Sequence, residues 1–256
     1  MTNKKTFTPE NLKQEFVKRI KLLLNNQTDF NSYLNTINKF PRNSIRCNTL
    51  KISINELKSR LEENYSWELE QPWKSNPEII IINSDLEPGE LGRTIEHLLG
   101  YYYIQELTSF LPIIALNPCN GESFLDLCAS PGSKTTQAAS YMENKGFIIA
   151  NEVSMGRLKI LSSNLERIGV LNTIISKKDG PALIKYNPNL KFNKILIDAP
   201  CSGEGTLRES YKTALMWNPK NIKNLSNLQK AMVSSAIPLL REDGELVYST
   251  CTHAPE

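Results

Sequence analysis

The chain has 256 residues, of which 40% are hydrophobic and 22% are charged, and its formal net charge is +3. This composition excludes a disordered protein and leaves enough apolar material for a packed core. No apolar run approaches the roughly 20 residues that span a bilayer, and the first residues lack the apolar stretch of a secretory signal, so we expect a cytoplasmic protein with no membrane partner.

The five cysteines are widely spaced and form no C-x-x-C pair. An odd number of cysteines without such spacing argues against a disulfide framework or a zinc site. We therefore expect reduced thiols and no bound metal. The cysteines are Cys47, Cys119, Cys128, Cys201 and Cys251.

The N-terminal third predicts a small α+β accessory domain over residues 1–90, with the remainder, 91–256, as a second domain. Its first helix follows a proline suited to a first turn, and Ser53 and Glu56 stand in capping-box spacing before the third helix. A turn-rich stretch at 83–94 is the expected linker. The expected helices are 9–25, 29–39 and 53–63, and the expected strands are 44–53, 67–70 and 78–82.

An aromatic run follows the expected linker. Residues 100–118, GYYYIQELTSFLPIIALNP, predict a strand and then a helix that begins near Thr108 and ends before Pro118. Tyrosines in such a strand can stack on bases or pack at a domain junction. The sequence leaves both interpretations open.

From residue 124 onward strands alternate with helices, which is typical of a parallel, doubly wound sheet. The fold class is therefore α/β with a Rossmann-like sheet, joined to the small N-terminal α+β domain. The expected strands are 124–129, 147–152, 173–177, 194–199 and 245–250, and the expected helices are 134–142, 154–168 and 222–240.

Each of these strands ends in polar or reactive residues. Because the carboxyl ends of parallel strands share one edge of a sheet, we expect their side chains to form one site. In strand order they are Ser130 with Gly132, Glu152, Asp179, Asp198 with Cys201, and finally Cys251.

The turns at this edge argue for one cofactor. The first turn is neither G-x-G-x-x-G nor a phosphate loop, which excludes a dinucleotide fingerprint there. A short glycine turn at a helix N-terminus can hold a carboxylate, the acid Glu152 can bind ribose hydroxyls, and Asp179 is placed for an adenine amino group. Carboxylate, ribose and adenine together describe S-adenosylmethionine.

Five stretches also carry a family resemblance: FLDLCASPGSKTTQAA, NEVSMGRLKIL, KKDGPAL, ILIDAPCSGEGTLR and LVYSTCTHAPE. They resemble the successive motifs of the Nop/Sun-type (RsmB/Nop) RNA cytosine-5 methyltransferases, and the likeness favours a tRNA-type member. It covers residues 118–256, while RCNTLKIS and YYYIQELTSFLP extend it into the N-terminal half with less specificity.

The chemistry of this family calls for the residue types at the sheet edge. Carbon 5 of cytosine is a poor nucleophile, so a thiolate must first add to carbon 6, and the thiol must later leave by elimination. The resemblance implies that Cys251 is the nucleophile and that Cys201 assists product release. It implies that Asp198 holds the base edge and that Lys134 neutralises charge on the base carbonyl.

The resemblance also implies which residues hold S-adenosylmethionine. They are Cys128, Ala129, Ser130, Pro131, Gly132, Ser133, Lys134, Glu152, Arg157, Asp179 and Asp198. Enzymes of this family continue beyond the point where this chain ends at Glu256. We therefore expect the last strands of the sheet to be missing and the catalytic domain to be incomplete.

The function predicted from sequence is methylation of an RNA cytosine by a monomeric enzyme, with tRNA favoured as substrate and ribosomal RNA next. One alternative is a catalytically silent RNA-binding protein that keeps the sheet. Another is DNA cytosine methylation, in which Cys201 of the Pro-Cys pair would be the nucleophile and Cys251 would have no role.

Overall fold

A computed structural model describes residues 6–179 and 189–256, and its elements group into two units drawn from separate stretches of the chain. The larger unit comprises Arg42–Ala199 and Met232–Ser249, and the smaller comprises Met1–Pro41, Pro200–Ala231 and Thr250–Glu256. The domain boundary expected between residues 90 and 91 stays a prediction. It would divide the sequence once, whereas each of these units is made of more than one stretch of the chain.

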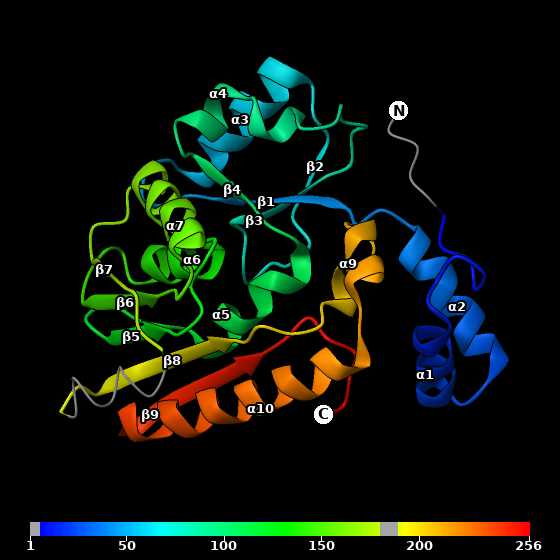
Figure 1. The fold of residues 1–256 in the computed structure, drawn as a ribbon. Helices are drawn as coiled ribbons and strands as arrows, with labels where there is room; N and C mark the ends of the chain where they lie inside the picture. Colours follow the sequence, from blue (N-terminus) through cyan, green and yellow to red (C-terminus); the bar gives the residue numbers. More distant parts are fainter. Residues whose placement is uncertain (1–5, 180–188) are drawn as a thin grey trace. The chain divides into compact units, whose positions relative to one another are not determined.

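The larger unit contains a five-stranded sheet whose strands are all parallel, in the order β7-β6-β5-β8-β9 (Figure 1). The chain runs outward from β5 to β7 and then returns to the other side of β5, so the topological switch point lies between β5 and β8. The expected parallel α/β sheet is confirmed. Its strands are β5 (Ser123–Asp126), β6 (Phe147–Asn151), β7 (Thr173–Ser176), β8 (Phe192–Asp198) and β9 (Leu240–Ser249).

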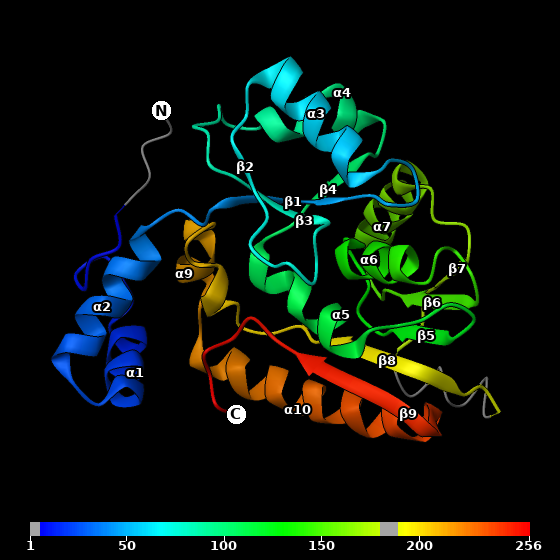
Figure 2. The same ribbon diagram turned by 180° about the vertical axis from the view of Figure 1, so that it is seen from behind.

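Helices cover both faces of this sheet (Figures 1 and 2). Leu196 packs with α5 and α6 on one face, whereas Ile195 and Ile197 pack against the end of α10 on the other. Because side chains alternate along a strand, Asp198 shares the α6 face with Leu196. The helices are α5 (Leu111–Leu116), α6 (Ser133–Tyr141), α7 (Met155–Ile168) and α10 (Pro219–Ala236), which is followed by the short turn η4 (Ile237–Leu239).

A second sheet in the larger unit is antiparallel and has the order β2-β3-β1-β4. Leu57 and Leu61 of α3 pack on one face of it, and α6 lies between the two sheets (Figure 1). The elements are β1 (Asn43–Cys47), α3 (Ile54–Tyr65), β2 (Leu69–Glu70), β3 (Ile79–Ile82), η1 (Glu90–Gly92), α4 (Ile95–Leu98), β4 (Tyr102–Ile104) and η2 (Leu107–Phe110).

Leu91, within the stretch 83–94 that the sequence predicts as a linker, belongs to this second core, and the linker stays a prediction. Leu91 is buried, and its carbonyl oxygen accepts a hydrogen bond of 2.6 Å from the Tyr102 hydroxyl. Tyr102 in turn lies on β4, which pairs with β1. Tyr102 and Tyr103 are both buried, so these two tyrosines pack within the unit and are not available to stack on bases.

The smaller unit is mainly helical. Phe16 and Phe30, from the first two helices, share a hydrophobic core with Trp217 and Ile222, far along the chain. The two N-terminal helices therefore pack with residues 200–231. None of the helices in the described ranges has the length and apolar character needed to cross a membrane. The elements are α1 (Gln14–Leu24), α2 (Gln27–Asn38), η3 (Glu204–Thr206), α9 (Tyr211–Met216) and the first turns of α10.

One buried cation joins the antiparallel sheet to helix α6 in the larger unit. Arg46 on β1 is fully buried, and its guanidinium donates to the Ser133 carbonyl oxygen at 2.9 Å and to Thr136 Oγ1 at 2.8 Å. It also donates to Gln105 Oε1 at 3.2 Å. Because Ser133 and Thr136 form the first turn of α6, this arginine fixes the start of that helix.

Replacing Arg46 with alanine should lower the free energy of unfolding by about 3 kcal/mol, because buried acceptors lose their donor and a cavity remains. Urea unfolding followed by circular dichroism measures the change. Arg93→Ala, at an exposed arginine, is the control and should change stability by no more than about 0.5 kcal/mol. Equal shifts in the two variants would contradict the role given to Arg46.

Candidate active site

The turn after β5 leads directly into α6 at the switch point. Gly132 has φ +106°, a left-handed conformation that favours glycine, and a Cβ atom there would lie 3.1 Å from Leu161 Cδ1. The next residue, Ser133, begins α6. The first N–H groups of a helix lack intrahelical acceptors, so this turn can bind an anionic group such as a carboxylate.

Lys134 and Asp198, two residues predicted for the site, meet at the same edge. Lys134 Nζ donates to Asp198 Oδ2 at 2.7 Å and to Ser109 Oγ at 3.0 Å. The other carboxylate oxygen of Asp198 accepts a hydrogen bond of 2.8 Å from Ser249 Oγ. The two serines were missed from the sequence because nothing local to either indicates this contact.

Asp126, at the end of β5, is a further acidic residue that the sequence analysis missed. Its side chain is buried, Oδ2 accepts from Thr135 Oγ1 at 2.7 Å, and within residues 6–179 and 189–256 no side chain or backbone group is placed to hydrogen-bond Oδ1. Burial raises the pKa of Asp126 to about 6. The hydrogen bond from Thr135 acts to lower this pKa, whereas the negative charge of the nearby Asp198 acts to raise it. A lone acid at the end of an apolar strand was the available signal, and its Oδ1 suits a cationic group.

The second strand end brings Glu152 and Arg157 to the first turn. Glu152 is buried and accepts from the Ser154 N–H at 2.8 Å, and its other oxygen lies 3.3 Å from Arg157 Nη1. Arg157 also donates to the Ser130 carbonyl oxygen at 2.5 Å, and Ser130 Oγ donates back to the Arg157 carbonyl oxygen at 2.9 Å. These contacts bring together Ser130, Glu152 and Arg157, three of the residues predicted to hold the cofactor.

The third strand end carries Asp179, which is exposed. The preceding residue, Lys178, is held by Asn151, whose side-chain amide bonds its backbone N–H at 3.0 Å and its carbonyl oxygen at 2.8 Å. Asn151 ends β6 and was also missed. The Gly180–Leu183 part of the KKDGPAL motif lies outside the described residues.

The remaining residues predicted for the cofactor form the turn itself. Cys128 Sγ lies 4.0 Å from Met232 Sδ, and burial raises the pKa of its thiol to about 12, which is typical of a packing residue. The Ala129 N–H donates to the Asn151 carbonyl oxygen at 2.8 Å, and Pro131 is exposed. The backbone of this turn, more than its side chains, is therefore available to a ligand.

The two predicted catalytic cysteines lie together in the smaller unit. Cys201 Sγ and Cys251 Sγ are 3.1 Å apart, and the two sulfurs are not joined in a disulfide. The hydrogen bond from Cys251 lowers the pKa of Cys201 to about 7, although burial opposes this shift. The pair therefore loses its first proton near neutral pH, and one thiolate is available for nucleophilic attack.

Two family models match the chain. The first, described as 16S rRNA methyltransferase RsmB/F, matches residues 113–256, more than half of the chain. The chain belongs to this family. The second, the N-terminal domain of 16S rRNA methyltransferase RsmF, matches residues 12–107. The resemblance drawn from the motifs is thereby confirmed for the Nop/Sun family, while its tRNA-type subdivision gains no support.

Individual relatives agree with this family. The chain is 42% identical to ribosomal RNA small subunit methyltransferase F of Vibrio cholerae over 96% of its own length and 52% of the relative's. The Pectobacterium carotovorum protein of the same name is 41% identical, over 96% and 51%. The chain therefore spans about half the length of these curated relatives.

A solved structure is also similar. It is a methyltransferase homolog protein from Pyrococcus horikoshii, with a TM-score of 0.74 and 32% identity over 95% of this chain and 79% of that one. In the RsmB/F family member described here, no three His, Cys, Asp or Glu side chains within residues 6–179 and 189–256 are grouped so as to hold a metal ion.

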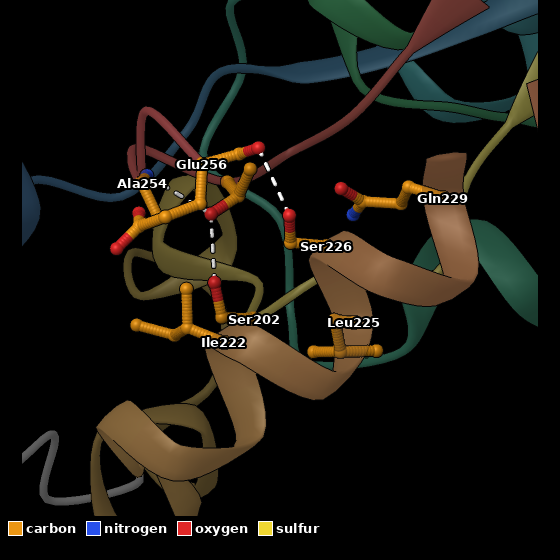
Figure 3. A pocket seen from close by; sticks show the side chains of 8 residues that line it. Ser202, Ile222, Leu225, Ser226, Gln229, Ala254 and Glu256 are labelled. Carbon is orange, nitrogen blue, oxygen red and sulfur yellow. Dashed lines mark hydrogen bonds between the residues drawn. The ribbon is translucent and has the colours of Figure 1, made fainter. Parts of the chain in front are cut away.

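A small cavity lies beside the cysteine loops (Figure 3). Ser202 and Thr252, the residues that follow the two cysteines, line one side, and Ile222, Ser226 and Gln229 of α10 line the other. Its volume is about 10 Å³, which suits one water molecule and is far too small for a nucleotide.

The low pKa of Cys201 predicts how its alkylation depends on pH. The rate with iodoacetamide should rise with a midpoint near 7 at Cys201, because the thiolate is the reactive form. Mass spectrometry of labelled peptides measures each site, and the exposed Cys119, labelled in the same sample, is the internal control.

In Cys251→Ala the hydrogen bond to Cys201 is lost, so the midpoint at Cys201 should move upward. A midpoint that stays near 7 in this variant would show that Cys251 does not stabilise the thiolate.

Proposed function

We propose that this chain carries the catalytic part of an S-adenosylmethionine-dependent RNA cytosine-5 methyltransferase. The observation that carries the proposal is the 3.1 Å approach of Cys201 and Cys251, which follow the ends of two neighbouring parallel strands. Addition to cytosine and later elimination need one thiolate as nucleophile and a second group that moves a proton during release. A pair of thiols that share a proton supplies both.

In this proposal Cys251 forms the bond from its sulfur to carbon 6 of the cytosine, and Cys201 assists the elimination that frees the product. Asp198 holds the ring-nitrogen edge of the base. Lys134 neutralises the negative charge that develops on the base carbonyl, and its contact with Asp198 fixes its position. Ser249 and Ser109 keep this ion pair oriented.

The residues at the sheet edge fit S-adenosylmethionine, which supplies an electrophilic methyl group when bound. The Gly132 turn and the first turn of α6 would hold its carboxylate. Oδ1 of buried Asp126 would accept from its ammonium group. Glu152 would bind the ribose hydroxyls and Asp179 the adenine amino group, with the backbone from Cys128 to Ser133 lining the site.

RNA is the proposed substrate, and 16S rRNA is favoured over tRNA. Curated relatives carry the name of a small-subunit ribosomal RNA methyltransferase, so the tRNA preference predicted from the sequence finds no support among them. The basic side chains also gather in the smaller unit. It has 12 of the 30 Lys and Arg residues but only 6 of the 27 Asp and Glu residues, which favours a polyanionic partner.

Loss of the Glu152 carboxylate should weaken cofactor binding. Glu152→Ala is expected to raise the Kd for S-adenosylmethionine between about 10- and 100-fold, the range for a hydrogen bond to a charged group. Isothermal titration calorimetry measures it. The control is Glu166→Ala, an exposed glutamate on α7, which should bind as the unmodified chain does. Equal affinity in both variants would remove Glu152 from the site.

Trapping the covalent adduct tests the proposed mechanism and the substrate together. With S-adenosylmethionine and RNA, Cys201→Ala should accumulate an adduct that survives denaturing electrophoresis, because product release is blocked. Cys251→Ala should form none. Each variant is incubated separately with 16S rRNA, small ribosomal subunits and total tRNA.

The RNA that forms the adduct, and the variant that traps it, distinguish the alternative functions. An adduct with tRNA alone would reverse the substrate preference, and an adduct in Cys251→Ala alone would exchange the roles of the cysteines. Cofactor binding without methyl transfer to any RNA would favour the silent RNA-binding protein. Methylation of DNA but not RNA would favour the DNA enzyme.

A further inference from the structure

A buried carboxylate lies between the loops that carry the two cysteines. Glu204 is 3% exposed, and its Oε2 accepts hydrogen bonds of 2.8 Å from both Ser202 Oγ and Thr252 Oγ1. The backbone N–H of His253 donates to the same oxygen at 3.3 Å. The other oxygen, Oε1, accepts from Trp217 Nε1 at 2.7 Å.

These donors come from three separate stretches of the smaller unit. Ser202 is the residue after Cys201, and Thr252 is the residue after Cys251, while Trp217 is the C-cap residue that follows α9. The Ser202 and Thr252 hydroxyls also lie 2.7 Å from each other. A single side chain therefore links the immediate neighbours of both sulfurs and fastens them to the helical core through Trp217.

The residue after Glu204 strengthens the same link. The Gly205 N–H donates to the Cys251 carbonyl oxygen at 2.7 Å. A Cβ atom at this position would lie 2.9 Å from that oxygen, so only glycine allows the two backbones to approach this closely. Glu204 and Gly205 thus bind the Cys251 loop through its backbone and through the side chain of Thr252.

The carboxylate is ionised at neutral pH. Burial acts to raise the pKa of Glu204, but hydrogen bonds from Thr252, Ser202 and Trp217 outweigh burial and hold the pKa below its usual value. A buried charge stabilised by several donors is strongly destabilised when one donor is lost. The arrangement of the donors, and with it the spacing of the loops, is therefore tightly determined.

We propose that Glu204 is a positioning residue that holds Cys251 against Cys201. It acts through Ser202 and Thr252 and sets the separation at which the two thiols share a proton. The catalytic meaning of this role rests on the proposed function, but the positioning itself concerns only the protein and can be measured without RNA or cofactor.

The first test uses diamide, a two-electron oxidant that takes two electrons and two protons from a pair of thiols as they form a disulfide. The rate of Cys201–Cys251 cross-linking, followed by peptide mass spectrometry, reports how often the sulfurs meet. Glu204→Ala should lower this rate by on the order of tenfold or more. It should also move the alkylation midpoint of Cys201 from about 7 toward the ordinary thiol value near ~8.5.

The conservative variant separates positioning from charge. In Glu204→Gln the amide oxygen can still accept from Trp217, and the amide N–H groups can donate to the Ser202 and Thr252 hydroxyls, which accept as well as donate. The bond lost is the long one, of 3.3 Å, from the His253 N–H, which an amide nitrogen cannot accept. Cross-linking should therefore stay within about threefold of the unmodified chain. Glu15→Gln, at an exposed glutamate on α1, is the matched control and should change nothing.

Two further variants test the proposal in case Glu204→Ala does not fold. If Glu204→Ala is unfolded by circular dichroism, Ser202→Ala and Thr252→Val each remove one donor and leave the carboxylate in place. Both should slow cross-linking by a smaller factor. Unchanged cross-linking in the folded Glu204→Ala variant, or in both donor variants, would overturn the proposal.

Methyl transfer then shows whether positioning matters for catalysis. Glu204→Ala should lower kcat while KM for RNA changes little, because the sulfurs are displaced but the basic residues of the smaller unit are unchanged, and Glu204→Gln should restore most of kcat. If cross-linking depends on Glu204 but no variant, nor the unmodified chain, transfers methyl groups, the proposed function fails and the positioning role stands.

Discussion

The reversal of strand order between β5 and β8 is the constraint on which the site in the larger unit depends. The loops after these two strands lead in opposite directions, so α6 can begin directly beside the end of β8. This is why Lys134, in the first turn of α6, reaches Asp198 at the end of β8 across 64 residues of sequence. The alternation along β8 then turns Asp198 toward α6, whereas Ile197 faces the opposite helix layer.

Keeping α6 at this point requires support from the second sheet. Arg46 of β1 bonds the first turn of α6 through Ser133 and Thr136, and burial lowers the pKa of its guanidinium to about 10 without removing its charge at neutral pH. The strand β1 thereby supports the edge of the parallel sheet at which α6 begins, although none of its residues lies there. This explains in physical terms why the antiparallel sheet and the parallel sheet form one unit.

The sequence predicted the parallel sheet and most of its polar strand ends, because hydrophobic periodicity and turn residues are local signals. It did not predict the grouping of α1 and α2 with residues 200–231, since that depends on Phe16 and Trp217 meeting across 200 residues. For the same reason Ser109, Ser249 and Glu204 were missed. Each is an ordinary polar residue in sequence and gains its role only from a distant partner.

The cysteine pair combines two opposing electrostatic effects. The hydrogen bond from Cys251 is the largest influence on Cys201 and lowers the pKa of that thiol, while the negative charge of Glu204 acts weakly in the opposite direction. An anion close to a thiol raises the pKa of that thiol and so disfavours the thiolate. It is tolerated because its hydrogen bonds hold the loops at the separation where the sulfur–sulfur hydrogen bond forms, and that bond outweighs the repulsion. Geometry, rather than local charge, therefore sets the reactivity of this pair.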